Sequence, residues 1–503
     1  MDSDRKWLCK HCEALLVGAI LLVALALRLY QIEANSFWID ELTKIRLIRP
    51  PFFSMLKSVL RDNATTPIDY VIAHFVYYYV GQSEGILRLP SVLWGTASVA
   101  ALYFLGRRMF DRTTGLLAAV VLVFVPSQIY FSQEMRSYIL TSFMVLLTTL
   151  AFQRALSLNT RGAWALYAGA LVAGMYSHYY VAVVGILHGA WLLLMCLAKR
   201  LPWRSLRSYL VAAGIAGLFF LPWVVLDVRD MLKRAGGFPE ATYRAPTLLS
   251  WLSSPFVGAN YAVPEYPSVT LFVEATGALA AAGVALAALR THVWWRNAGL
   301  LAFVGLGGMG AVIALDAIAP FYFYTRQMVP FGPPVLLLVC AAWVGLFRAA
   351  WRRLTRHPAG WRSGALAAIV FVAFAAGTLA GPLAGTYASR KHDYRGVSRY
   401  LLQYVHWDDS VVTYIPYYVE LYVPELADQI VTNKGLSTIQ TEAKTHTRVW
   451  IVDRTETYGR RVPDVLAWIQ SEKPLEIQGF YGIRLYLYSE KMTPDELRDS
   501  VRR

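Results

Sequence analysis

Residues 12–30, CEALLVGAILLVALALRLY, decide the fold class of this chain. A helix needs about 20 apolar residues to cross a bilayer, because no water is available there to satisfy its backbone groups. The stretch therefore predicts a transmembrane helix. The positive charges that precede it, Arg5, Lys6 and Lys10, place the N-terminus on the cytoplasmic side. We expect this span to be retained, since no small-residue cleavage site follows Ala26.

Apolar runs of the same kind recur along most of the chain. Hydrophobic residues make up 56% of the sequence and charged residues only 16%, whereas a soluble protein carries about a quarter charged residues. We therefore expect a polytopic α-helical membrane protein with about 11 transmembrane helices. The expected spans are residues 12–30, 90–110, 114–131, 138–156, 163–180, 181–198, 208–226, 269–289, 298–319, 328–348 and 362–385.

Positive charges flank alternate spans, as they do in cytoplasmic loops. The apolar stretch Thr66–Val80 is about 15 residues long, which is short for a span. Counting it as one would invert every later loop. We therefore expect two juxtamembrane helices in the first outer loop, Glu41–Leu60 and Thr66–Val80. An odd number of spans then leaves the C-terminus outside the membrane.

Three outward segments follow from this direction: residues 31–89, residues 227–268, and a tail that begins at 386. The tail has the pattern of a small α/β domain, which divides the chain into 1–385 and 386–503. Its expected elements are helices at Tyr394–Val405 and Val462–Gln470, strands at Ser410–Ile415, Arg448–Val452 and Gly482–Tyr488, and a last helix opened by the capping box Thr493–Glu496.

Ionisable residues are scarce in the centres of the spans and gather at their outer ends. Transporters place such residues near the midplane of the membrane, often on broken helices. Here Asp40 and Glu41 follow the first span, Glu134 and Arg136 the third, while His178 ends the fifth and Arg326 opens the tenth. The pattern indicates a site at the boundary between lipid and water. The formal net charge of +15 does not indicate nucleic acid, because no basic-aromatic groove motif is visible.

Several short motifs occur in order along the first part of the chain. They are Ser36-Phe37-Trp38-Ile39-Asp40-Glu41, Thr66-Pro67-Ile68-Asp69-Tyr70, Leu87-Arg88-Leu89-Pro90-Ser91, Tyr130-Phe131-Ser132-Gln133-Glu134-Met135-Arg136-Ser137-Tyr138 and Tyr324-Thr325-Arg326-Gln327-Met328-Val329-Pro330. In this order they resemble bacterial relatives of the protein O-mannosyltransferases and of the aminoarabinose transferase that modifies lipid A. The resemblance, strongest over residues 30–180, implies the fold of a GT-C glycosyltransferase that uses a polyprenyl-phosphate-linked sugar.

The resemblance implies that Asp40 is the general base, with Glu41 as its neighbour. Such a base takes the proton of the acceptor hydroxyl and contributes about 10²–10⁴-fold to the rate. An alternative is that Asp40 and Glu41 only cap the helix that starts at Leu42, since acids favour helix N-termini. With Trp38 before them and the other motifs in order, we favour catalysis.

The leaving phosphate needs fixed positive charge, and Arg supplies it in a planar fork. The candidates are Arg136 and Arg326, followed by Lys44 and Arg88, although such side chains also extend to lipid headgroups without any catalytic role. Glu134 is a further candidate, which could pair with Arg136, orient the acceptor, or hold a divalent cation with Asp40. The sequence leaves the metal open, because a dedicated site needs more oxygen ligands than are obvious here.

His178 and Tyr179 are the candidate substrate contacts, with an aromatic belt at the interface as the alternative. Related enzymes often have His-Pro-Pro where this chain has Thr65-Thr66-Pro67, which puts the identity of the sugar or the acceptor in doubt. The tyrosines of the tail suit either sugar stacking or a small core.

These features predict a multi-pass glycosyltransferase of the bacterial inner membrane, moving a hexosyl or pentosyl group at the outer face. The donor is a polyprenyl-phosphate-linked sugar, and the acceptor is a lipid, a polysaccharide or a protein. The alternative is a flippase or transporter of lipid-linked sugars, for which the polar cluster would be only a vestibule.

Overall fold

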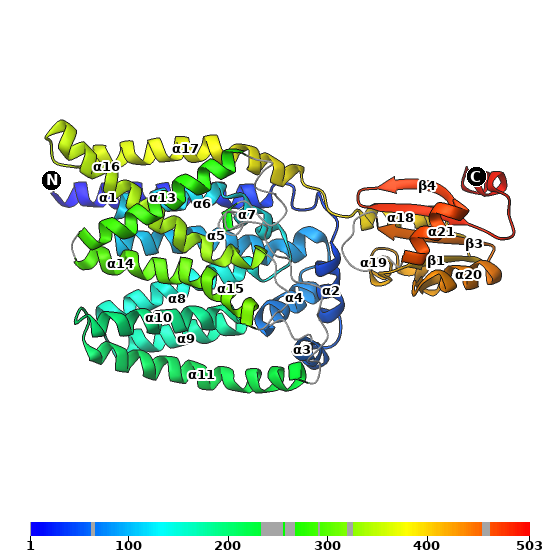
Figure 1. Cartoon of the computed structure of the whole chain (residues 1–503), viewed down its shortest axis with the longest axis horizontal. Helices are drawn as coiled ribbons and strands as arrows, with labels where there is room; N and C mark the ends of the chain where they lie inside the picture. Colours follow the sequence, from blue (N-terminus) through cyan, green and yellow to red (C-terminus); the bar gives the residue numbers. More distant parts are fainter. Residues whose placement is uncertain are drawn as a thin grey trace. The chain divides into compact units, whose positions relative to one another are not determined.

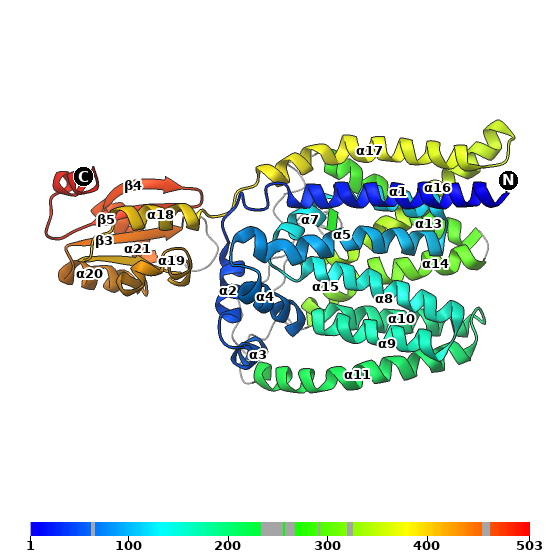
Figure 2. The same ribbon diagram turned by 180° about the vertical axis from the view of Figure 1, so that it is seen from behind.

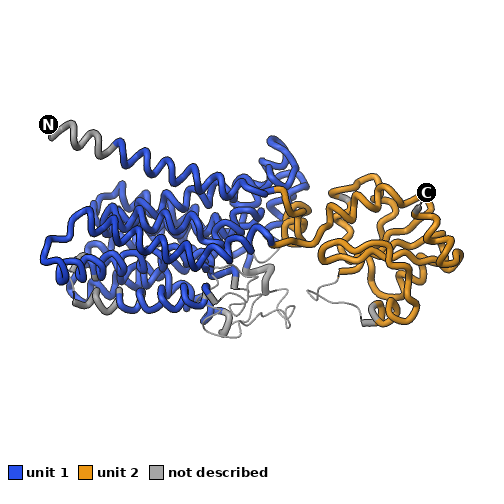
Figure 3. The backbone as a smooth tube through the Cα atoms, turned by 90° about the horizontal axis from the view of Figure 1, so that it is seen from above, with its two compact units in different colours: residues 1–32, 47–388 blue, residues 33–46, 389–503 orange. Residues whose placement is uncertain are grey.

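The computed structural model describes residues 2–61, 66–232, 255–256, 267–289, 292–318, 325–454 and 463–502. The chain divides into two compact units, coloured separately in Figure 3. Unit 1 comprises Met1–Ile32 and Leu47–Ala388, and unit 2 comprises Glu33–Arg46 and Ser389–Arg503. The segment with the Asp40 motif therefore clusters with the tail, although it lies at the other end of the sequence. The expected division into domains 1–385 and 386–503 stays a prediction.

Unit 1 is a bundle of long helices that run side by side (Figures 1 and 2). Its long helices are α1 (Asp2–Leu29), α5 (Glu84–Met109), α6 (Arg112–Phe124), α8 (Tyr138–Leu158), α9 (Arg161–Ser177), α10 (Tyr180–Leu197), α11 (Trp203–Leu232), α13 (Pro267–Leu289), α14 (His292–Ala302), α15 (Gly308–Ile318), α16 (Gly332–Thr355) and α17 (Trp361–Ala388). One end of the bundle contains the C-terminal ends of α1, α9, α11 and α17 and the N-terminal ends of α5, α8, α10 and α16 (Figures 1 and 2). We call this end the site end.

Within the described residues, eight helices are long and apolar enough to cross a membrane, and the bent pair α6–α7 makes a ninth. The short helix α7 (Pro126–Tyr130) continues α6 at an angle of 64°, because Pro126 cannot extend the helix hydrogen bonding. The expected span 163–180 corresponds to α9, which has 17 residues. The expected span 269–289 corresponds to α13, which contains the shorter apolar helical segment Thr270–Leu279. The polytopic helical fold is confirmed, and the outer segment 227–268 lies almost entirely outside the described residues.

The first outer loop differs from the expectation in one respect. The single helix expected at Glu41–Leu60 is wrong, because the chain forms two helices, α2 (Ile39–Ile48) and α3 (Phe52–Arg61). Pro50 and Pro51 separate them, since a proline disfavours helical geometry in the residue before it and has no N–H to donate. The second expected helix is present as α4 (Pro67–Tyr79).

Charges at the opposite end of the bundle are paired with one another. Glu13 on α1 accepts Arg107 of α5 at 2.8 Å and Arg112 of α6 at 3.5 Å. Asp111 pairs with Arg348 of α16 at 2.7 Å. These are the residues that flank the predicted cytoplasmic ends of the spans, and their pairing ties four helices together.

Unit 2 contains a five-stranded mixed sheet in the order β2-β1-β3-β5-β4. The central strand β3 (Arg448–Arg454) is parallel to β1 (Asp409–Thr413) and antiparallel to β5 (Ile483–Tyr488). The remaining elements are β2 (Ile430–Thr432), β4 (Leu475–Phe480), α18 (Tyr394–Tyr404), α19 (Tyr417–Tyr422), η5 (Pro424–Gln429), α20 (Leu436–Thr445), α21 (Pro463–Glu472) and α22 (Pro494–Arg502). The sequence predicted the small α/β domain and the three central strands, but not β2, β4 or α20.

Alternate residues of the central strands face opposite sides of the sheet. On one side, Ile451 packs with Ile439 of α20 and Trp468 of α21. On the other side, the ring of Trp450 contacts Tyr400 of α18. Because both faces are covered, β1 and β3 are buried along almost their whole length.

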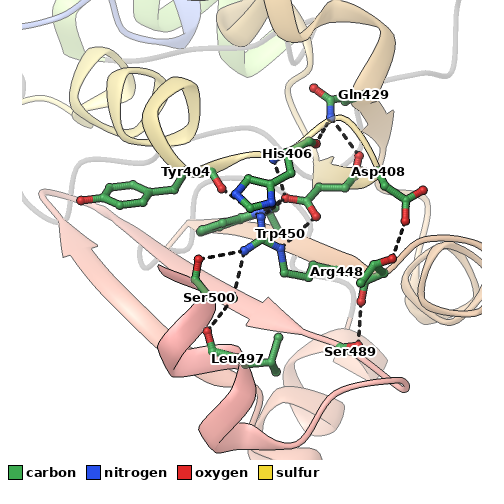
Figure 4. Close-up of polar contacts among 11 residues, drawn as sticks. Tyr404, His406, Asp408, Gln429, Arg448, Trp450, Ser489, Leu497 and Ser500 are labelled. Atoms are coloured by element: carbon green, nitrogen blue, oxygen red, sulfur yellow. Dashed lines mark hydrogen bonds and ion pairs between the residues drawn. The ribbon is translucent and has the colours of Figure 1, made fainter. Parts of the chain in front are cut away.

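A buried ion pair joins the first and the central strand of this sheet (Figure 4). The guanidinium of Arg448 donates to both carboxylate oxygens of Asp409, at 2.9 and 2.6 Å. It also donates to the hydroxyl of Ser500 and to the carbonyl of Tyr404, and the indole of Trp450 donates to Asp409. The last helix, α22, is thereby fixed to the sheet.

Candidate functional site

Two of the predicted phosphate-binding arginines lie together at the site end of unit 1. The guanidinium carbon of Arg136 is 6.0 Å from the centroid of the Tyr138 ring, and that of Arg326 is 5.7 Å from the same centroid. Both arginines are partly exposed, while Tyr138 is buried. Two cations near one aromatic ring concentrate positive charge, which suits an anion.

The fold around Tyr138 explains why these arginines converge. Arg136 lies just before α8, and Arg326 lies in the short helix η4 (Thr325–Phe331) just before α16. Tyr138 packs in a small cluster with Phe131 and Val329, which anchors both helix starts. Sequence reasoning quoted Tyr138 within a motif but assigned it no role, because only the tertiary structure shows that it is shared.

His178 lies in the two-residue connection between α9 and α10, close to Arg136. The pKa of His178 is lowered to about 4, mainly by burial and also by the positive charge of Arg136, while Asp69 of α4 partly opposes this effect. The Nδ1 atom of His178 accepts the backbone N–H of Tyr180 at 3.2 Å. His178 is therefore a neutral imidazole at pH 7 with its proton on Nε2.

We expect the stability of the protein to depend on His178 at acidic pH. Its pKa is lower in the folded state than the ordinary 6.5, so the unfolded chain binds more protons between about pH 4 and 6.5. Stability then rises with pH across this window. In His178→Asn the amide oxygen can still accept the Tyr180 N–H, but the titration is lost. Denaturant unfolding of both proteins at several pH values gives the free energy of unfolding as a function of pH. We expect this free energy to rise less steeply with pH in the variant. An equal rise in both proteins would contradict a His178 that is neutral in the folded state.

Tyr179 is committed to a contact with α11. Its hydroxyl donates to Asp227 at 2.7 Å and accepts the indole N–H of Trp223 at 3.1 Å. Burial and the neighbouring carboxylate raise the pKa of Tyr179 well above its ordinary value. The predicted substrate contact thus also orients Asp227, which the sequence analysis missed. The signal was available, since Asp227 directly follows the expected span 208–226.

Polar side chains at the site end also hold the chain where it leaves α1. Arg88 on α5 is fully buried and donates to the carbonyl of Ile32 at 2.7 Å. Gln133 donates to the carbonyls of Arg28 and Tyr30. The neighbouring Glu134 is buried as well. Arg88 therefore supports the start of the loop that leads to Asp40.

Asp40 and Glu41 lie in the first turn of α2, in unit 2. The carboxylate of Glu41 accepts the backbone N–H of Trp38 at 3.3 Å, which is one of the two hydrogen bonds of a capping box. The capping role that the sequence left open for both acids is thus performed by Glu41. Lys391, which the sequence analysis missed, is 3.9 Å from the Glu41 carboxylate, and Lys44 is buried one turn further along α2.

In the part of the chain that the structure describes, no group of three or more His, Cys, Asp or Glu side chains is placed to hold a metal ion. The described carboxylates of the site lie singly or in the pair Asp40-Glu41. The described residues of unit 1 present an arginine pair, a histidine and the buried carboxylate of Glu134, while unit 2 presents the acids Asp40 and Glu41.

Comparisons with known proteins concern the fold and the family of the chain. Residues 65–226 match the model of the dolichyl-phosphate-mannose-protein mannosyltransferase family. No curated protein matches the chain in sequence. Several solved structures match it in fold, although their sequences are only 12% identical to it.

Three of these structures cover most of the chain. ArnT from Cupriavidus metallidurans, in the apo state, has a TM-score of 0.59 and covers 95% of this chain and 99% of its own. The same protein bound to undecaprenyl phosphate has a TM-score of 0.58 with the same coverage. The oligosaccharyltransferase of Archaeoglobus fulgidus has a TM-score of 0.58 and covers 89% of this chain and 70% of its own. The chain therefore has the membrane fold of these solved structures, and residues 65–226 resemble the dolichyl-phosphate-mannose-protein mannosyltransferase family.

Proposed function

We propose that the protein transfers a sugar from a polyprenyl-phosphate donor to an acceptor hydroxyl. The observation that carries this proposal is the convergence of Arg136 and Arg326 on the Tyr138 ring, at the end of a membrane bundle. An anionic headgroup on a lipid is the ligand that such a place suits. ArnT from Cupriavidus metallidurans, which shares this fold, has been solved with undecaprenyl phosphate.

The chemistry divides between a base and a cation site. The acceptor oxygen forms a bond to the anomeric carbon of the sugar, while the bond from that carbon to the phosphate oxygen breaks. Asp40 takes the hydroxyl proton and later releases it to water. The phosphate changes from a diester with one negative charge to a monoester with up to two. Arg136 and Arg326 stabilise the charge that develops, so they favour the transition state over the bound donor.

The remaining predicted residues support these groups. Glu41 caps α2 and so orients Asp40, while Arg88 holds the chain before it. Lys44 adds positive charge next to Asp40, Glu134 orients the acceptor, and His178 and Tyr179 contact the sugar. The protein resides in the bacterial inner membrane, with its N-terminus in the cytoplasm and its C-terminal unit outside.

Reconstitution in liposomes tests transfer against transport. Purified protein is mixed with polyprenyl-phosphate sugars and a lipid and polysaccharide extract of the cell envelope. Transfer releases free polyprenyl phosphate and adds the mass of one sugar to an acceptor, both measured by mass spectrometry. Movement of intact donor between leaflets, without either product, would instead support a carrier of lipid-linked sugars.

We expect Arg136→Gln and Arg326→Gln each to reduce kcat by about 10- to 100-fold, because a hydrogen bond to a charged group contributes about 1.5–3 kcal/mol. Lysine at either position should recover only part of the rate, since it lacks the planar fork. Arg362 provides a matched control, because its guanidinium lies over Trp361 at the opposite end of the bundle. A loss in Arg362→Gln equal to that in Arg136→Gln would contradict a specific phosphate site.

A further inference from the structure

The loop that carries Asp40 is tied to the beginning of the C-terminal chain in unit 2. The side-chain amide of Asn35 donates to the carbonyl of Ser389 at 3.1 Å and accepts the backbone N–H of Lys391 at 3.0 Å. The hydroxyl of Ser36 donates to the carbonyl of His392 at 2.8 Å. These three hydrogen bonds fix the backbone just before the first turn of α2.

Two tyrosines of α19 hold the same segment on either side of Asp40. The backbone N–H of Phe37 donates to the hydroxyl of Tyr422 at 2.9 Å, and the two rings lie 6.4 Å apart. The hydroxyls of Thr43 and Tyr417 are 3.3 Å apart, and the guanidinium of Arg46 lies 5.2 Å from the Tyr417 ring. The segment is therefore held both three residues before Asp40 and three residues after it.

Lys391 contacts the first turn of α2 itself. Its ammonium lies 3.9 Å from the Glu41 carboxylate and 5.6 Å from the centroid of the Trp38 ring. The side chain of Lys391 is only 10% exposed and that of Glu41 is fully buried. The carboxylate that caps α2 is thus also paired with a cation from the C-terminal unit.

We propose that residues 389–422 form a positioning element for Asp40, with Tyr422 and Lys391 as its positioning residues. The proposal rests on the proposed function, in which Asp40 is the base. A displacement of about 1 Å at a reacting group can cost about 10²-fold in rate, so a base in the first turn of a short helix needs such support. The proposal gives the tyrosines of the tail a role other than sugar stacking. Tyr417 and Tyr422 contact the segment that carries Asp40, and Tyr418 is buried against Tyr394.

The test uses the full chain with two variants and two matched controls. Tyr422→Phe keeps the ring and removes the acceptor of the Phe37 N–H, and Lys391→Met removes the cation. We expect each to lower kcat by about tenfold while the KM for the donor changes by less than about twofold. Lys391→Arg keeps the charge and should stay within about threefold of the wild type. The controls are Tyr481→Phe and Lys434→Met, whose side chains are exposed elsewhere in unit 2.

Two further measurements separate positioning from loss of fold. Hydrogen exchange should become faster at the Phe37 amide and stay unchanged in β3. In the Asp40→Asn background, Tyr422→Phe should cause no further loss of kcat, because a positioning residue acts through the group it positions. Unchanged kcat in Tyr422→Phe and Lys391→Met, or losses that multiply with that of Asp40→Asn, would overturn the proposal.

The two proposals fail in different ways. If Asp40 is not the base, Asp40→Asn alone keeps near-normal transfer, which removes the proposed function as well. If Asp40 is the base but the C-terminal unit does not position it, Asp40→Asn loses activity while Tyr422→Phe and Lys391→Met behave like their controls. The two sets of results therefore identify which of the two proposals is wrong.

Discussion

Asp409→Leu should destabilise the C-terminal unit by about 3–5 kcal/mol, because it leaves the buried guanidinium of Arg448 without its counter-ion. The side chains of this pair are each only 2% exposed, so water cannot replace the lost contact. Trp450 loses the acceptor of its indole N–H at the same time. A domain is stable by only about 5–15 kcal/mol, so the loss is a large part of the total. Hydrogen exchange of the β1 and β3 amides in the full-length protein measures it.

The double variant Asp409→Leu/Arg448→Met separates charge from packing. Replacing both partners by apolar groups removes the uncompensated charge, so we expect the double variant to be more stable than Asp409→Leu alone. Glu476→Gln is the control, since Glu476 and Arg484 form an exposed pair at 3.6 Å on the same sheet. Such pairs contribute about 0–1 kcal/mol. An equal loss in Asp409→Leu and Glu476→Gln would contradict the assigned role of the buried pair.

The parts of the fold that depend on local pattern could be predicted from the sequence. Long apolar runs have few alternatives to a membrane helix, and the capping box at Thr493 is present as expected, with Glu496 accepting the Thr493 N–H at 2.8 Å. The two short or half-exposed edge strands, β2 and β4, carry too weak an alternation to be distinguished from loops. The break at Pro50 and Pro51 could have been predicted, because two prolines cannot lie inside one helix without disrupting it.

The contacts of the candidate site could be predicted only in part. Arg136 and Arg326 were predicted because each lies at the end of an expected span, a property of the local sequence. Their shared ring, Tyr138, is visible only after α8 and η4 pack together. Lys391 was missed because it is far from Glu41 in sequence and has no motif around it. Partners of this kind follow from tertiary structure, and a single sequence carries no record of them.

The most direct test of the proposed mechanism removes the carboxylate of Asp40. We expect Asp40→Asn to lower kcat by about 10²–10⁴-fold, since it keeps the shape of the side chain and removes the proton acceptor. The KM for the donor should change little, because in the proposed mechanism Asp40 acts on the acceptor hydroxyl. Asp40→Glu should retain more activity than Asp40→Asn, as it keeps a carboxylate with a longer reach.

Asp428→Asn is the matched control, because Asp428 is an exposed acid of the same unit in η5. Glu41→Gln separates the two acids of the motif. It weakens the cap on Trp38 and the pairing with Lys391, so its loss should be smaller than that of Asp40→Asn and accompanied by faster hydrogen exchange in α2. Near-normal kcat in Asp40→Asn at saturating donor, together with a large loss in Glu41→Gln, would transfer the role of base from Asp40 to Glu41. Glu41 is buried, and its carboxylate accepts the Trp38 N–H. Both facts argue for Asp40 as the base and for the larger loss in Asp40→Asn.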